Sequence, residues 1–599
     1  MNVNWRTRSE REDVPIAVSV AGRVQHETER PLQEFWRHRT GCRAARRRTH
    51  RRCPECAPMH LQTRLASVCH QGGIALIIAG QPELGFGHVF GRHVVGEPVL
   101  DLDRLAEIES QVCPIEGREL RVVRPQAPPV VDTSPIDTDL VLGRFASAGT
   151  LHVDQAVEAA YRARRGWEKL GWQKRVAILR KAAGLVRASK FELAACMSLE
   201  VGKSRLESLG DAEESADLID YYAGQMEEAD GFRRKMNRLT PIEDNTDLLR
   251  PFGVFVCISP FNFPLALACG MSSAALVAGN TLVMKPAQDT PWTGLRLYQL
   301  YREAGVPGDV LHFLSGRGSV IGDALWQHPR VDGLVFTGSK EVGLRMFQGF
   351  STRWVKPCLA ELGGKNACIV AESADLDAAA EGVMKSAWGL QNQKCSACSR
   401  VYVHRKVAEE FTARLIDRTR RMTIGDPTQR DVFFGPVINR KAVETFERAV
   451  ELARRDGRIL LGGGRISGGA FARGHYVEPT IVQAPLASRL FLEEFFVPVL
   501  AIGEIDSVEQ AIAETNRAEY GLTAGLFSRE PAEIDSFFDE IEAGVTYVNK
   551  RTGATTGAWP GAQPFCGWKG SGSTGKGGCG PYYVMQFMRE QSRTVIQER

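Results

Sequence analysis

The sequence predicts an α/β fold with parallel sheets over most of its length. Apolar runs of strand length recur along the chain, and stretches with helical periodicity separate them. The helical period is clear where Val153, Val157 and Tyr161 recur at steps of four. Alternation of this kind is typical of parallel sheets covered by helices. The expected strands are 254–258, 281–284, 334–336, 368–370 and 401–403.

Length and composition narrow the class of protein. A chain of 599 residues is long enough for about three to five domain-sized units. With 43% hydrophobic and 24% charged residues it fits a soluble globular protein. A net charge of +4 is too small to indicate a polyanion-binding protein. The 14 cysteines are too few for a disulfide scaffold, so we expect a reduced, cytoplasmic protein.

Residues 1–110 read as a basic, poorly specified extension. The segment 35–54 is rich in arginine and has no acidic residue. Such a segment could bind nucleic acid or act as a targeting signal, but a solvated basic tail is the favoured interpretation. The spacing of Cys53 and Cys56, followed by Cys69-His70, would suit zinc, but the second ligand pair is incomplete. We therefore expect no metal, and nucleic-acid binding is a minor alternative.

Two further segments bear on the organisation of the chain. Residues 265–284 carry no charge over a length that could span a membrane. Their Ser, Asn and Thr residues, and the abrupt end at Lys285-Pro286, favour a buried helix running into a buried strand, so no membrane partner is expected. Residues 125–129 hold two adjacent prolines and read as a linker into the folded body.

The segment 259–264, Ser-Pro-Phe-Asn-Phe-Pro, follows an expected strand. An Asn between two prolines and two aromatic residues is held rigidly, so the Asn262 amide could face a developing oxyanion. Taken alone, the segment is a turn. Further on, Lys285 at a strand end and Gly338-Ser339 at the start of a helix suit ribose and phosphate contacts.

Two later segments add reactive groups. Glu361 precedes Gly363-Gly364, and a carboxylate in an apolar setting beside two glycines can act as a general base. The alternative for Glu361 is a pair with Lys365 across a turn. Cys395 follows a lysine and precedes small residues, as a reactive thiol would. Its alternatives are a buried structural cysteine and a redox pair with Cys398.

Together these segments supply a nucleophile, an oxyanion donor, a base and a nucleotide turn. From about residue 114 to the C-terminus the chain resembles the aldehyde dehydrogenase superfamily. The stretches 393–400 (Gln-Lys-Cys-Ser-Ala-Cys-Ser-Arg), 549–554 (Asn-Lys-Arg-Thr-Gly-Ala), 563–569 (Gln-Pro-Phe-Cys-Gly-Trp-Lys) and 571–572 (Ser-Gly) carry the resemblance. Within the family they are most similar to members that oxidise L-glutamate γ-semialdehyde, which forms from 1-pyrroline-5-carboxylate.

The resemblance implies a role for each of these groups. Cys395 would attack the aldehyde to give a thiohemiacetal and then a thioester, Asn262 would hold the oxyanion, and Glu361 would activate water. The resemblance also implies that NAD is the cofactor and that the reaction belongs to proline catabolism. The implied cofactor-binding residues are Ile258, Pro260, Lys285, Gln288, Gly318, Phe336, Gly338, Ser339, Leu362, Glu494 and Phe496. The implied substrate-binding residues are Phe263, Ser396, Gly567 and Trp568.

Four positions depart from the family pattern: Gln288, Asn392, Val497 and Cys566. Gln288 stands where many relatives have Glu. Because an amide does not repel a 2′-phosphate, NADP stays an alternative to NAD. Asn392 and Val497 replace glycines near the thiol and near the nicotinamide contact. Cys566 replaces a glycine in the loop expected to bind the substrate carboxylate, so another small semialdehyde, such as succinate semialdehyde, is the alternative substrate.

The resemblance also implies the architecture. It predicts two parallel-sheet α/β domains and a small β-flap that mediates assembly into a homodimer or a larger homo-oligomer. We expect a NAD-binding domain over 111–362, including part of the flap near 238–250, and a catalytic thiol domain over 363–564. Residues 565–599 would supply the substrate-anchoring loop and the C-terminal oligomerisation segment. The expected small-molecule partner is an aldehyde that carries an amino-acid carboxylate.

Overall fold

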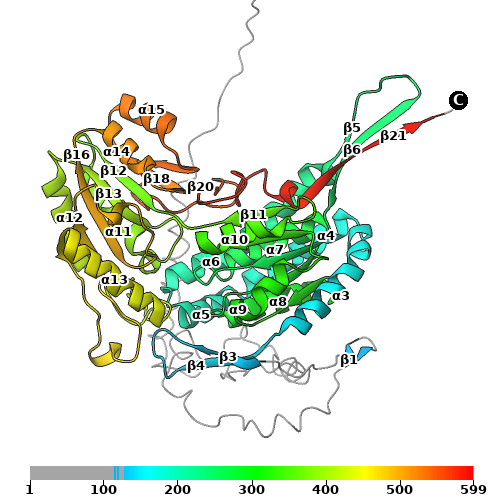
Figure 1. Ribbon diagram of the computed structural model, residues 1–599, viewed down its shortest axis with the longest axis horizontal. Coiled ribbons are helices and arrows are strands. Elements are labelled where there is room, and N and C mark those ends of the chain that lie inside the picture. Colours follow the sequence, from blue (N-terminus) through cyan, green and yellow to red (C-terminus); the bar gives the residue numbers. More distant parts are fainter. Residues whose placement is uncertain (1–113, 116–117, 120–126, 598–599) are drawn as a thin grey trace, which may run out of the picture. The chain divides into compact units, whose positions relative to one another are not determined.

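The computed structural model describes residues 114–115, 118–119 and 127–597. It contains two parallel sheets, each between layers of helices, as the sequence predicts (Figure 1). The predictions for residues 1–110, including the possible zinc ligands Cys53, Cys56, Cys69 and His70, lie outside the described residues.

The first sheet has five parallel strands in the order β11-β10-β7-β8-β9. In that order they are Cys358–Glu361, Gly333–Thr337, Val254–Ile258, Thr281–Lys285 and Leu311–Phe313. The helices of this region are α3 (Thr150–Lys169), α4 (Trp172–Ala188), α5 (Lys190–Val201), α6 (Arg205–Glu228), α7 (Ala266–Ala278), α8 (Pro291–Ala304), α9 (Gly318–Trp326) and α10 (Lys340–Phe350).

Alternate residues of β7 enter two different cores. Phe255 and Cys257 pack with residues of α4, α6, α7 and α8. Val254 and Val256 pack with residues of α3, α9 and α10. Since successive side chains of a strand point to opposite faces, a sheet covered on both sides needs apolar residues at every position. The continuous apolar runs in the sequence have this cause, and all five predicted strands are confirmed.

The second sheet has seven strands in the order β14-β15-β16-β13-β12-β18-β19, and all neighbours are parallel except β14 and β15. In that order they are Arg458–Leu461, Thr480–Gln483, Val499–Ile505, Cys398–His404, Asn366–Val370, Thr523–Phe527 and Val545–Val548. The helices of this region are α11 (Leu376–Trp388), α12 (Ala408–Arg420), α13 (Arg440–Asp456), α14 (Val508–Asn516) and α15 (Pro531–Glu540).

A third, antiparallel sheet joins segments far apart in the sequence. Figure 1 shows β6 (Glu243–Pro251) beside β21 (Met588–Ile596), and β5 (Arg233–Lys235) pairs with β6 on its other side. The remaining short elements are β1 (Pro114–Ile115), β2 (Arg118–Glu119), β4 (Val141–Ser147), β17 (Tyr520–Gly521), β20 (Trp568–Lys569), η4 (Asp230–Phe232), η5 (Gly389–Asn392), η6 (Gly469–Phe471), η7 (Arg489–Phe491) and η8 (Val584–Phe587).

The structure corrects one prediction and confirms another. The linker expected at 125–129 is wrong from residue 127 on, because Ala127–Thr133 forms β3, which pairs with β4. A register shift between Ala127 and Val130 lets the two prolines sit in the strand without donating to the ladder. The uncharged stretch 265–284 is a buried helix followed by a buried strand. In the described part of the chain no helix is both long and apolar enough to span a membrane.

Candidate active site

The first sheet gathers several predicted site residues at one edge. Because its strands are parallel, their carboxyl ends meet there. Ile258 lies opposite both Lys285 and Phe336. Thr337, which follows Phe336 on β10, lies opposite Glu361 on the neighbouring strand β11. Four of these residues end their strands and Phe336 stands one position before the end of β10, so all five lie at the edge where open α/β sheets bind ligands.

The loop 259–264 follows β7 and forms the predicted turn. Asn262 is buried in it, with 3% of its surface exposed. The ring of Phe261 packs edge-on against that of Phe496, with 5.9 Å between the ring centroids. This contact joins the loop that carries the predicted oxyanion donor to the segment that carries a predicted nicotinamide contact.

Cys395 lies in a short loop between η5 and β13, and a side chain from the neighbouring strand β12 fixes this loop. The Asn366 amide nitrogen donates to the backbone oxygens of Cys395 (2.7 Å) and Ala397 (2.9 Å). The Asn366 amide oxygen accepts from the backbone N–H of Thr523 at 3.0 Å. Every polar atom of the amide thus has a partner, and the thiol loop is tied to the middle of the second sheet.

The approach to the thiol loop has an unusual backbone. Leu390, Gln391 and Asn392 all have positive φ, at 51°, 54° and 61°. Asn tolerates this left-handed conformation better than most residues other than glycine. The Asn392 amide also donates to the backbone oxygens of Ala387 (2.9 Å) and Cys398 (2.8 Å). Asn392, which stands where the family usually has glycine, therefore keeps a glycine-like conformation. Its side chain also bridges α11 and β13.

Gly363 and Gly364 allow a close approach on both sides. A side chain at Gly364 would begin 2.3 Å from the Cys395 backbone oxygen. One at Gly363 would begin 2.1 Å from a carboxylate oxygen of Glu494. The Gly364 N–H also donates to the other Glu494 oxygen at 2.7 Å. The glycine pair therefore brings the thiol loop and Glu494 together at the end of β11.

Glu361 ends β11 with a buried carboxyl group. Its Oε2 has no hydrogen-bond partner among the described residues. Burial raises the pKa of Glu361 well above its usual value, while the Gly567 backbone acts in the opposite direction. The pair with Lys365 that the sequence also allowed does not occur among the described ion pairs, and the Lys365 ammonium lies 5.2 Å from the Phe495 ring centroid instead. Once ionised, a carboxylate with this high proton affinity can take a proton from water.

The thiol of Cys395 is free and partly exposed. Burial, followed by the negative charges of Glu361 and Glu494, raises its pKa to about 12, and the Ser396 backbone N–H opposes the shift. The thiol therefore needs a positive charge beside it to become a thiolate at neutral pH. Cys398 is also a free thiol, buried in β13, where its Sγ contacts the Arg400 backbone oxygen at 3.5 Å.

The predicted cofactor residues fit a dinucleotide. Lys285 is buried at the end of β8, where burial lowers its pKa to about 8, and its ammonium donates to the Pro286 oxygen at 3.0 Å. Gly318 opens α9, and a side chain there would meet nothing within 4 Å. Ser339 is the N-cap of α10. Helix N-termini with open space in front of them suit phosphate groups. Gln288 is exposed.

The loop predicted to bind the substrate carboxylate lies against Glu361. The backbone of Gly567 interacts with the Glu361 carboxyl. The Cys566 thiol donates to the Gly544 backbone oxygen at 3.4 Å, and its pKa is raised by burial and by Glu361. Trp568 pairs through its backbone with β17, and 46% of its surface is exposed. The loop thus reaches the Glu361 carboxyl, with the indole of Trp568 partly in solvent.

Sequence reasoning missed two residues that hold the thiol loop. Besides Asn366, the Thr555 hydroxyl donates to the Ser396 backbone oxygen at 2.7 Å. Thr555 directly follows the stretch 549–554, which carries the family resemblance. The one feature of the sequence that pointed to Thr555 was therefore its position directly after this stretch. For Asn366 the only local sign was its place after Gly363-Gly364-Lys365.

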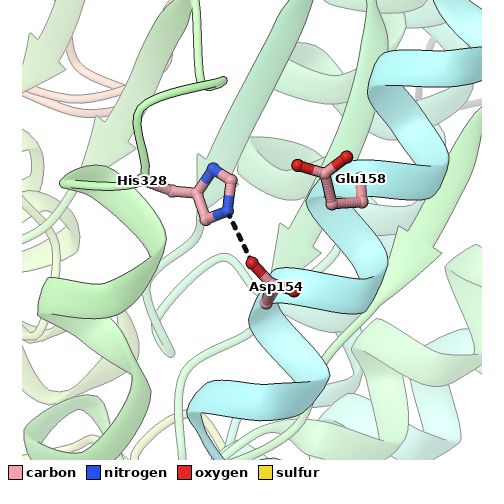
Figure 2. A group of neighbouring side chains, drawn as sticks. All are labelled: Asp154, Glu158 and His328. Carbon is pink, nitrogen blue, oxygen red and sulfur yellow. Dashed lines mark hydrogen bonds and ion pairs between the residues drawn. The ribbon is translucent and has the colours of Figure 1, made fainter.

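A second polar group lies outside this site. Figure 2 shows Asp154 and Glu158 on α3 beside His328, with ligand atoms within 4.8 Å of one another. His328 Nε2 faces Asp154 at 3.3 Å, its Nδ1 accepts from the Arg330 backbone N–H at 3.2 Å, and Arg330 pairs with Glu158 at 2.7 Å. With one ring nitrogen donating and the other accepting, no lone pair is left for a metal. The group ties α3 to the segment after α9.

Comparison with known proteins assigns the chain to a known family. The aldehyde dehydrogenase family profile matches residues 123–593, and the chain belongs to this family. The curated 1-pyrroline-5-carboxylate dehydrogenase of Geobacillus kaustophilus is 36% identical over 475 residues, which cover 78% of this chain and 90% of that protein. The protein named 1-pyrroline-5-carboxylate dehydrogenase 1 of Halalkalibacterium halodurans is 36% identical over 470 residues, or 78% and 89%.

Solved structures give the same result. A 1-pyrroline-5-carboxylate dehydrogenase from Thermus with bound NAD superposes with a TM-score of 0.75 at 34% identity, covering 79% of this chain and 90% of that one. The proline utilization A protein of Bdellovibrio bacteriovorus superposes with a TM-score of 0.76 at 34% identity. The superposed part covers 83% of this chain and 51% of that protein. The predicted fold class is thereby confirmed.

Proposed function

We propose that this chain catalyses the NAD-dependent oxidation of L-glutamate γ-semialdehyde, the open form of 1-pyrroline-5-carboxylate, to L-glutamate in proline catabolism. The observation that carries the proposal is the convergence of Cys395, Glu361 and Glu494 at the end of β11. The relatives at 36% identity bear the name of this activity and support it over other semialdehydes.

In the first half of the reaction, the Cys395 sulfur attacks the aldehyde carbon. A carbon–sulfur bond forms, the thiol proton passes to water, and the carbonyl oxygen takes the negative charge. We assign the side-chain amide of Asn262 and the backbone N–H of Cys395 as the donors that hold this oxyanion. Addition of sulfur turns an aldehyde, which has no leaving group except hydride, into an alkoxide that can expel one.

The chemistry that NAD supplies when bound is acceptance of the hydride from the substrate carbon. Lys285 and Gln288 would hold the adenosine ribose, Gly318 and Ser339 the pyrophosphate, and Glu494 the nicotinamide ribose. The buried Glu494 carboxyl, whose pKa burial raises to about 7, already accepts from Gly364 and keeps a second oxygen for a ribose hydroxyl. The further cofactor contacts are Ile258, Pro260, Phe336, Gly338, Leu362 and Phe496.

In the second half, Glu361 takes a proton from water as the water oxygen attacks the thioester carbon. The carbon–sulfur bond breaks, and the Cys395 sulfur leaves as a thiolate and takes up the proton from Glu361. L-glutamate is thereby released, and the thiol and the carboxylate are both restored. The unpartnered, buried Glu361 oxygen supports this assignment, because a desolvated carboxylate binds a proton strongly. A base at this position favours transfer of the acyl group to water.

For the substrate carboxylate we propose Ser396 together with the backbone N–H groups of Gly567 and Trp568, with Phe263 against the aliphatic chain. Backbone N–H groups of a glycine-rich loop form good anion sites. The Cys566 thiol is engaged with the Gly544 carbonyl, so this departure leaves the neighbouring N–H groups free of the cysteine side chain.

We also propose the domain limits and the assembly. The first sheet ends at Glu361 and the second begins at Asn366, which supports a boundary between residues 362 and 363. The flap formed by β5, β6 and β21 exposes Leu239 and Ile596, at 89% and 52%. Exposed apolar side chains on an antiparallel flap support a homodimer or larger oligomer. Light scattering of the purified chain measures the assembly directly.

A steady-state assay with two semialdehydes and two nucleotides tests the proposed function. L-glutamate γ-semialdehyde with NAD should give the highest kcat/KM of the four combinations. A much higher value with succinate semialdehyde would contradict the assignment of the carboxylate-binding loop, and a higher value with NADP would contradict the cofactor.

A further inference from the structure

Two lysine ammonium groups approach the ring of Phe263, the residue that follows Asn262. The Lys203 ammonium lies 3.8 Å from the ring centroid. The Lys394 ammonium lies 5.8 Å from it and precedes Cys395 in the chain. Cations are attracted to an aromatic face at such distances. The ring therefore links the loop of Asn262 to the loop of Cys395.

Both lysines are paired with acidic residues on one face of α6. Lys203 pairs with Asp211 at 2.5 Å, and neither side chain has any exposed surface. Lys394 pairs with Glu207 at 2.6 Å. Glu207 and Asp211 are four residues apart, so their side chains lie one turn apart on the same face of the helix. A single helix face thus fixes both cations relative to each other.

Asp211 also holds the chain that follows Phe263. Its second carboxylate oxygen accepts from the backbone N–H of Ala266 at 2.7 Å. Ala266 is the first residue of α7, and a carboxylate at a helix N-terminus is well placed. Asp211 therefore positions the ammonium group at the ring and, separately, the backbone just after the ring.

The burial of this pair calls for an explanation beyond stability. Burial lowers the pKa of Lys203, and Asp211 acts against that shift. A buried ion pair loses hydration and is often no more stabilising than apolar residues of the same size. Here the Asp211 carboxylate holds the Lys203 ammonium with one oxygen and the start of α7 with the other, so the pair fixes one position for both groups.

We propose that Lys203 and Asp211 are positioning residues of the active site, which clamp Phe263 and thereby set the Asn262 loop relative to Cys395. The inference rests on the proposed function, because it assigns Asn262 and Cys395 the roles given above. Neither Lys203 nor Asp211 touches the reacting atoms, and their effect passes through the ring of Phe263 and the start of α7.

A double-mutant cycle between Lys203 and Phe263 tests the clamp. The measured quantity is the rate constant of the NADH burst, with L-glutamate γ-semialdehyde and with propanal as aldehydes. Lys203→Met should lower it by about 10- to 100-fold, the loss expected from a small misplacement of reacting groups. In a Phe263→Leu background the same change should cost less than about threefold, because the ring is already absent. The dissociation constant of NAD should stay within about twofold throughout.

Lys190→Met is the matched control. Lys190, the first residue of α5, pairs at 2.5 Å with Glu213, which lies on α6 like Asp211. This pair lies away from Phe263. The Lys190→Met change should leave the rate constant of the NADH burst unchanged. Equal losses from Lys203→Met in the two backgrounds, or an equal loss in Lys190→Met, would overturn the clamp.

Asp211→Asn provides the second variant, since it keeps the shape and an acceptor for Ala266 while removing the charge. It should slow the burst with unchanged nucleotide binding, and a normal burst would overturn the proposal. If Lys203→Met and Asp211→Asn both fail to fold, the pair maintains the fold rather than the loop, and the proposal is wrong. If the unmutated protein gives a burst with propanal but none with L-glutamate γ-semialdehyde, the proposed function is contradicted. The double-mutant cycle can then still be measured with propanal.

Discussion

Asn366 donates its side-chain amide to the backbone oxygen of Cys395 at 2.7 Å, across 29 residues of sequence. A second bond to Ala397 and an accepted bond from Thr523 saturate the amide. The loop that carries Cys395 is therefore held through its backbone from the central strands of the second sheet. Its side chain remains unpaired with another cysteine and is free to react.

Replacement of Asn366 by Ala should loosen the thiol loop. The change leaves buried carbonyl groups without donors, so the free energy of unfolding should fall by about 1–3 kcal/mol. The kcat should fall by about 10- to 100-fold because the thiol is displaced. Denaturant unfolding and steady-state kinetics measure the two effects. Asn516→Ala, which removes a bond to the Glu540 oxygen and one from the Glu542 N–H near the surface, is the control. An unchanged kcat in folded Asn366→Ala would show that the loop needs no such support.

Gln288→Glu should raise the preference for NAD over NADP. A carboxylate beside the adenosine ribose repels a 2′-phosphate, but at this exposed position the repulsion is only about 1 kcal/mol, or roughly fivefold. The ratio of kcat/KM for the two nucleotides measures it at low salt. Gln327→Glu, at the exposed C-terminal end of α9, adds the same charge elsewhere. An equal shift in both variants would mean that Gln288 does not face the ribose.

The raised pKa of Cys395 predicts how its reactivity depends on pH. Since burial and the acids around the thiol raise its pKa to about 12, the thiolate fraction without NAD should grow about tenfold per pH unit. Alkylation by iodoacetamide, followed by mass spectrometry of the Cys395 peptide, should therefore accelerate from about pH 7 to about pH 9.5 without a plateau. NAD, which carries a positive ring charge, should move the curve to lower pH. A plateau below about pH 8 without NAD would indicate a preformed thiolate.

Much of this arrangement follows from local sequence. Apolar runs without alternation predict the buried strands, as in Val254–Ile258, because both faces of the sheet are covered. Glycines predict close approach, and Gly363 and Gly364 each leave room for a neighbouring group. The turn of Asn262 and the helix start at Ser339 are likewise local features.

Long-range contacts account for what the sequence did not predict. The bond from Thr555 to Ser396 spans 159 residues, and no local pattern specifies it. The strand formed by Ala127–Thr133 was misread because its prolines are tolerated only through an irregular pairing with β4. Asn392 looked like a disturbance of the thiol loop, yet its amide occupies two carbonyl groups that a glycine could not reach.

Cys395→Ala should abolish dehydrogenase turnover while nucleotide binding is retained. The thiol is the only protein nucleophile in the proposed reaction, and its removal leaves the cofactor edge of the first sheet intact. NADH binding by fluorescence and turnover by absorbance separate the two properties. Retained turnover in this variant would refute the role of Cys395.

The most direct test is a single-turnover experiment on Glu361→Gln. With NAD and L-glutamate γ-semialdehyde it should release one equivalent of NADH per subunit and then stop. Mass spectrometry should find the acyl group on the peptide that contains Cys395, because the step that needs a base is blocked. Continued turnover at the wild-type rate, or an acyl group on any other residue, would contradict the account.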